Sequence, residues 1–181
     1  MRDQTKPGWA LQRLLDIHAL IRNDLASLRQ AVAAVAANGA GDQAAAALAN
    51  LSIGQPDWSL HRYCAEFCSF IHEHHSVEDA VMFPSVLDVA GDQPGLRATV
   101  DRLRAEHAEI ATYVDAAGRA VAALPGDAGT RATAISALTA LADRLAGHLA
   151  YEEESLAAAL NEVSNRLTPE DVGAPEPPVR R

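Results

Sequence analysis

Six polar residues occupy positions where the surrounding helical pattern predicts leucine or alanine. They are His18, His74, Glu78, His107, His148 and Glu152. An unpaired carboxylate in an apolar interior is very costly, and an imidazole without a hydrogen bond costs roughly a few kcal/mol. A metal centre would satisfy all six groups together, because iron, manganese and zinc accept imidazole nitrogens and carboxylate oxygens as ligands.

The spacing of these residues supports one shared centre. His74 precedes Glu78 by four positions, and His148 precedes Glu152 by the same interval. Residues four apart lie on one helix face, about 6 Å apart along the axis, so each pair can present a nitrogen and an oxygen to the same point. Carboxylates that bridge would hold two ions roughly 3.5–4 Å apart. Four nitrogens and two bridging carboxylates leave coordination positions open for solvent or a small ligand.

The placement of these pairs is more informative than their number, since the composition alone predicts about one His–acid pair at this spacing by chance. The Glu-x-x-His spacing of ferritin-like di-iron bundles is absent from the sequence. That class of di-iron protein is therefore disfavoured.

Long amphipathic segments are predicted to position the six residues. Apolar side chains recur at intervals of three and four, and Gly- and Pro-containing stretches separate the segments. We predict long helices that end at Asn38–Gly39, run from Asp57 to about Gly91, run from Leu96 to Leu124 and run from Arg131 to Arg166, with a short alanine-rich helix over 42–53. The predicted fold is all-α, an antiparallel up-and-down four-helix bundle in one domain over 1–166. The polar, proline-rich residues 167–181 are predicted to be a disordered tail.

Composition and charge exclude several other classes. The net charge is -9 and no Lys/Arg cluster could follow a phosphate backbone, so we expect no nucleic-acid partner. The longest apolar stretch is far shorter than the roughly 20 residues that span a bilayer, and no signal peptide is visible, which predicts a cytoplasmic protein without a membrane partner. Cys64 and Cys68 lie one helical turn apart, where a disulfide is hard to close.

Four stretches resemble the hemerythrin-like, HHE cation-binding domain family, over roughly Leu11 to Leu160. They are DIHALIR around His18, HHSVEDAVMFP from His74, AEHAEI around His107 and HLAYEEE from His148. The resemblance implies a hemerythrin-like bundle in which these four histidines are terminal ligands and Glu78 and Glu152 bridge two irons with an oxo or hydroxo bridge. It also implies a non-haem di-iron centre that meets dioxygen, hydrogen peroxide or nitric oxide, or that senses iron and redox state.

One departure from that family bears on function. Oxygen-carrying hemerythrins have a second histidine one turn after the first on the third helix, where this chain has Ala111. The missing ligand favours a reactive or sensing site over simple oxygen carriage. His75 is the nearest candidate for a fifth nitrogen, but it projects about 100° from His74, so a role beside the ligands is favoured. Tyr151 could ligate or donate a hydrogen bond, and core packing is the favoured interpretation.

Other polar residues near the predicted ligands have simpler interpretations. His72 points to nearly the opposite side of its helix from the predicted ligands, so we expect it in solvent. Asp79, Glu106 and Glu153 either orient the imidazoles or belong to a solvated face.

Three functional classes remain open on the sequence. The first is a di-iron oxidoreductase that metabolises peroxide or nitric oxide, and the second is a sensing or iron-storage protein without turnover. The third is a bundle held together by structural zinc, since zinc and manganese accept the same ligands as iron. The oligomeric state and the native metal are not predicted.

Overall fold

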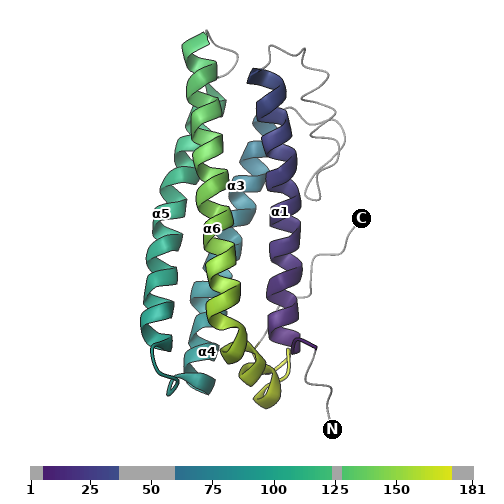
Figure 1. Ribbon diagram of the computed structural model, residues 1–181, viewed down its shortest axis with the longest axis vertical. Helices are drawn as coiled ribbons and strands as arrows, with labels where there is room; N and C mark the ends of the chain where they lie inside the picture. The colour runs from purple at the N-terminus through teal and green to yellow at the C-terminus, as the bar shows by residue number, and fades with distance from the viewer. Residues whose placement is uncertain (1–5, 37–59, 124–127, 173–181) are drawn as a thin grey trace.

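The computed structural model describes residues 6–36, 60–123 and 128–172, and within these ranges every regular element is a helix. The elements are α1 (Trp9–Ala36), α3 (Leu60–Val77), the π-helical segment η1 (Glu78–Met82), α4 (Phe83–Ala90), α5 (Leu96–Ala122) and α6 (Ala128–Arg166). Since α3, η1 and α4 are continuous, the helices form rods that alternate in direction along the chain, as Figure 1 shows. The predicted all-α bundle is confirmed. The predicted helix over 42–53 lies outside the described residues.

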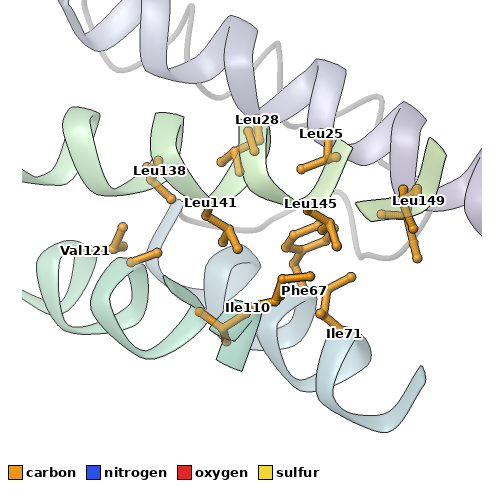
Figure 2. Packing of buried hydrophobic residues seen from close by; sticks show 14 residues of the cluster. Leu25, Leu28, Phe67, Ile71, Ile110, Val121, Leu138, Leu141, Leu145 and Leu149 are labelled. Atoms are coloured by element: carbon orange, nitrogen blue, oxygen red, sulfur yellow. The ribbon is translucent and has the colours of Figure 1, made fainter. Parts of the chain in front are cut away.

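Two hydrophobic clusters hold the rods together, one above and one below the middle of the bundle as drawn in Figure 1. The upper cluster, shown in Figure 2, consists of Ile21, Leu25, Leu28, Phe67, Ile71, Ile110, Val114, Ala117, Val121, Leu138, Leu141, Ala142, Leu145 and Leu149. The lower cluster consists of Ala10, Leu11, Leu14, Phe83, Val86, Ala90, Leu96, Val100, Leu103, Leu156, Ala159, Leu160 and Val163. Burial of one such large side chain stabilises the fold by about 1.5–3 kcal/mol. The polar residues lie between the clusters, so apolar packing on both sides keeps the rods in place around them.

The π-helical segment begins at the first predicted carboxylate ligand. The backbone N–H of Phe83 donates to the carbonyl of Glu78, five residues earlier, where an α-helix would use a residue four earlier. The next residue is Pro84, which has no N–H and whose ring crowds the preceding turn, so local widening is expected there. The wide turn leaves Glu78 and Phe83 both buried, one in the polar layer and one in the lower cluster.

The start of α1 is fixed to the end of α6. The backbone N–H of Gly8 donates to Oδ1 of Asn161 at 2.7 Å, and the indole N–H of Trp9 donates to the carbonyl of Leu167 at 3.0 Å. A Cβ on Gly8 would lie 2.5 Å from Ser164 Cβ, so only glycine allows this close approach. Asn161 and Ser164 of α6 thereby accept from the backbone N–H groups of Gly8 and Ala10, which the first turn of α1 leaves unpaired.

The first residues of the predicted tail form a local turn. The hydroxyl and the backbone N–H of Thr168 both donate to Oδ2 of Asp171, at 2.9 and 2.8 Å, so residues 167–172 form a local turn. A short polar side chain that bonds nearby backbone stabilises such turns without a hydrophobic core, which composition alone does not reveal. Residues 173–181 lie outside the described part of the chain. No helix within the described ranges combines the length and hydrophobicity that a bilayer crossing requires.

Candidate metal centre

The six predicted ligands meet between the two hydrophobic clusters, and every one of them is buried. Their exposed fractions are His18 0%, His74 8%, Glu78 3%, His107 5%, His148 0% and Glu152 0%. The first comes from α1, the next two from α3 and η1, the fourth from α5, and the last two from α6. All the rods of the bundle therefore contribute to one polar layer.

Glu78 reaches histidines on three elements. Its Oε1 lies 3.2 Å from Nε2 of His74 and 3.8 Å from Nε2 of His18, whereas its Oε2 lies 3.5 Å from Nε2 of His107. The two oxygens of this carboxylate therefore face different imidazoles, which is the arrangement that a bridging ligand requires.

Glu152, on α6, also approaches His18 and adds His148 to the group. Its Oε2 lies 3.5 Å from Nε2 of His18 and 3.6 Å from Nε2 of His148. Two donors that each lie about 2.1 Å from one ion are about 3.0–3.4 Å apart at right-angled or tetrahedral geometry. The observed nitrogen–oxygen separations are close to that range, so they fit neighbouring ligands of a metal ion.

His75 lies inside this layer, contrary to the position beside the ligands that the sequence favoured. It is 6% exposed, and its ring stacks on that of His107 with centroids 4.0 Å apart. The potential ligand atoms form two groups, and within each group they lie within 4.8 Å of one another. One group consists of His75, His107 and His148, and the other of His18, His74 and Glu78.

The angle between the side chains of the adjacent histidines explains why both can lie in the layer. A turn of about 100° separates neighbours on a helix, which is too much for one shared ion but suits two separate donor groups. The dipeptide His74–His75 made His75 the nearest candidate for a fifth nitrogen, but its angle to His74 alone favoured a position beside the ligands.

The buried nitrogen and oxygen atoms that could ligate a metal in the layer have no hydrogen-bond partner among the described residues. They are Nε2 of His18, His74, His75, His107 and His148 and both carboxylate oxygens of Glu78 and Glu152. One unsatisfied buried polar atom costs about 1–3 kcal/mol, and native proteins contain few of them. So many unpaired donors at one point fit a bound metal, which would pair with all of them.

Burial lowers the pKa values of the imidazoles, as metal binding requires, and raises those of the two glutamates, which lack a cationic partner among the described residues. Desolvation, followed by the charges of neighbouring histidines, holds the pKa of His74 well below its usual value, and desolvation lowers that of His107 to about 3. These imidazoles stay neutral and can bind a metal through a lone pair. Desolvation raises the pKa of Glu78 well above its usual value and that of Glu152 to about 8. No described arginine or lysine forms an ion pair with either glutamate, so a bound cation would supply the missing positive charge.

A carboxylate outside the layer orients His18. Oε1 of Glu153 accepts a hydrogen bond from Nδ1 of His18 at 2.8 Å, and Arg22 donates to both oxygens of Glu153 at 2.7 and 2.9 Å. Burial would raise the pKa of Glu153, but the hydrogen bonds from His18 and Arg22 outweigh it and lower the pKa to about 2. The carboxylate thus stays charged and keeps the His18 proton on Nδ1, which leaves Nε2 free to face the layer.

The same arrangement occurs at two other histidines. Nδ1 of His148 lies 3.0 Å from Oε2 of Glu106, which also accepts from Nε of Arg102 at 3.0 Å. Nδ1 of His107 lies 3.2 Å from Oδ1 of Asp79. The alternative that these acids only form a solvated face is therefore wrong for the contacts observed. Such partners fix ring orientation and raise the basicity of the ligating nitrogen.

Two other residues named from the sequence lie away from the layer. His72 is exposed, as expected for the far side of its helix. The ring of Tyr151 is half-buried, packs against the lower cluster and lies beneath the guanidinium of Arg102, whose central carbon is 3.7 Å from the ring centroid. This is the packing role that the sequence favoured for Tyr151.

Comparison with known proteins gives one match. A family model described as "Hemerythrin HHE cation binding domain" matches residues 10–160. Neither the curated proteins nor the solved structures gave a match. The matched range contains the buried histidines of the layer together with Glu78 and Glu152.

Proposed function

Because the chain belongs to the hemerythrin HHE cation-binding domain family, we propose that it holds a non-haem di-iron centre that binds or reacts with dioxygen, hydrogen peroxide or nitric oxide. The observation that supports this most directly is the layer of buried, unpaired imidazole nitrogens and carboxylate oxygens. The donor set is typical of iron, which accepts imidazole and carboxylate together.

The contacts suggest how the ligands divide between two ions. His18 and His74 would hold the first ion, and the second would be held by His75, His107 and His148. Glu78 and Glu152 would bridge the ions, since each lies between the two groups of histidines.

This division leaves the two ions with unequal coordination. The first ion would have two imidazoles and two carboxylates, and the second would have three imidazoles and the same carboxylates. Iron bound by oxygen and nitrogen ligands commonly takes six of them, so the ion held by His18 and His74 would have more positions left for an added ligand. We therefore place the exogenous ligand on the side of His18 and His74. His75 would supply the nitrogen that the third long helix lacks at Ala111.

The bound metal would supply Lewis acidity and one-electron redox chemistry. The chain's own residues orient and shield it. Hydrogen bonds from Nδ1 of His18 and His148 to outer carboxylates fix these two rings, and the hydrophobic clusters above and below limit the access of water.

Reconstitution with iron under anaerobic conditions tests the proposal. We expect about two irons per chain, and a change in the visible or electron paramagnetic resonance spectrum when dioxygen, hydrogen peroxide or nitric oxide is added. His72→Ala, on the exposed side of the helix that carries His74, is the matched control and should retain both irons. His107→Ala should lose iron.

The same experiment separates the competing functions. Catalytic turnover with peroxide or nitric oxide would identify an oxidoreductase, whereas stoichiometric uptake without turnover would identify a sensing or storage protein. Exclusive binding of zinc, with no spectral response of iron-treated protein to any of the three ligands, would overturn the di-iron proposal.

A further inference from the structure

A cavity of about 90 Å³ lies between α1 and the η1–α4 segment, and it reaches the metal-binding layer. His74 and Glu78 form part of its wall, so one end of the cavity lies at the proposed first ion. One water molecule occupies about 10–15 Å³ of such a cavity, and a diatomic ligand is of similar size, so the cavity is several times larger than a diatomic ligand requires. The size indicates space for a small organic molecule.

The wall of the cavity is apolar along most of its length. Leu14, Met82 and Val86 line it, all of them from or beside the lower cluster. At its edge lies Val77, which is 37% exposed and is the only large hydrophobic side chain among the described residues that counts as exposed. Apolar walls that continue to an exposed apolar edge are typical of sites that take a hydrocarbon group.

The same wall carries a cation, Arg13, that has no partner in the described part of the chain. Arg13 is half-buried and forms no ion pair or hydrogen bond with any residue of the described ranges. The next arginine along the helix, Arg22, binds Glu153 through both of its terminal nitrogens. In a chain with a net charge of -9, a guanidinium that no acidic residue of 6–36, 60–123 or 128–172 pairs with is available to an exogenous anion.

We infer that this cavity binds a short-chain aliphatic monocarboxylate, whose carboxylate pairs with Arg13 and whose hydrocarbon chain packs toward Leu14, Met82 and Val86. The inference goes beyond the proposed function, because it places an organic molecule beside the metal-binding layer. A dianion would leave its second charge unpaired against the apolar wall, and an organic cation would be repelled by Arg13.

Binding can be measured on the full chain as purified. Isothermal titration with butanoate and hexanoate gives the affinity, and 1-butanol and 1-hexanol serve as uncharged probes of the same length. Trp9 lines the cavity, so its fluorescence reports occupancy in a Trp58→Phe variant, in which Trp9 is the only tryptophan. We expect saturable binding of both carboxylates, with hexanoate the tighter, and weaker binding of the alcohols.

Two variants test the two halves of the site. Arg13→Gln should weaken carboxylate binding by at least about tenfold and leave alcohol binding unchanged, because a charge-assisted hydrogen bond is lost. Ala10→Leu, which adds apolar atoms to the cavity wall, should abolish binding of carboxylates and alcohols alike. Arg119→Gln, at an exposed position near the end of α5, is the control and should change neither.

The outcomes are independent of the metal assignment, because metal content is measured separately on the same samples. Carboxylate binding that Arg13→Gln leaves unchanged, or an equal affinity for acids and alcohols, would overturn the inference. A carboxylate that alters the metal spectrum without dependence on Arg13 would show binding at the metal instead, and absence of saturable binding would leave the cavity as a path for gases only. Each of these results refutes the carboxylate site, whether or not the chain holds iron.

Discussion

Replacement of His75 by leucine should change the stability of the metal-free and metal-loaded protein in opposite directions. In the metal-free protein, Nε2 of His75 is buried without a hydrogen-bond partner. Removal of such an atom should stabilise the fold by about 1–3 kcal/mol, and loss of the ring stacking with His107 would offset about 0.5–1.5 kcal/mol of that. For a chain of this size, about 1 kcal/mol corresponds to roughly 2–4 °C, so the melting temperature should rise by a few degrees.

In the metal-loaded protein, the same substitution removes one of three imidazoles from the proposed second ion. Loss of a ligand should weaken binding of that ion by at least about 100-fold, which lowers the stabilisation by bound metal by about 2.7 kcal/mol. The gain of about 1 kcal/mol in the metal-free fold offsets part of this loss and leaves a net loss of roughly 1.7 kcal/mol, so the melting temperature with iron present should fall by roughly 3–7 °C relative to the unsubstituted chain.

Differential scanning calorimetry with and without iron, together with metal analysis, measures both effects. His72→Leu is the matched control, because this histidine is exposed on the same helix and its replacement should alter neither melting temperature by more than about 2 °C. A lower melting temperature of the metal-free His75→Leu protein, with both irons retained, would refute the reasoning and show that His75 only packs.

Three further predictions concern the surroundings of the metal-binding layer. Glu106→Gln, which removes the charge that accepts the hydrogen bond of His148, should weaken iron binding by about 10–100-fold in equilibrium dialysis, and an unchanged affinity would contradict the orienting role. Removal of iron by a chelator should lower the melting temperature by roughly 8–16 °C at iron concentrations about 1,000-fold above the dissociation constant, because bound metal then contributes about 4 kcal/mol. Desolvation raises the pKa of Cys68 to about 11 from 9.0, so at pH 8 in a Cys64→Ser background its alkylation by iodoacetamide should be about 100-fold slower than in denaturant. Because the pKa of the Cys68 thiol is raised in the folded state, the thiol also contributes stability that is present below pH 9 and is lost as the pH rises toward 11. Rapid alkylation of Cys68 in the folded chain would contradict the raised pKa.

The fold and the main candidate residues could be predicted because both follow from helical periodicity. His18 and His107 stand out in the sequence as polar residues on apolar stripes, and the structure brings both into the buried layer. The all-α bundle follows from the same stripes, because four amphipathic helices with short connections must bury their apolar faces against one another. These features depend on local spacing, which a sequence displays directly.

The remaining features depend on distances across the bundle. The partner of His18 is Glu153, 135 positions away, and no pattern within either helix joins them. The cavity beside Arg13 depends on how far α1 lies from η1 and α4, which periodicity does not specify. The role of His75 was predicted from its angle to His74 alone. Only the positions of α5 and α6 show that His107 and His148 lie in the direction of its side chain.

The π-helical turn that begins at Glu78 also constrains changes in chain length. Because the wide turn takes up one extra residue, deletion of one residue from 79–82 would restore ordinary α-helical spacing and keep α4 on nearly the same face relative to α3, whereas deletion of a second residue would rotate α4 by about 100°. Phe83 and Val86 would then leave the lower cluster while His74 kept its place, so packing and donor geometry could not both be preserved. Deletion scanning should therefore find that this short segment tolerates the loss of one exposed residue, such as Ala80, but not the loss of two.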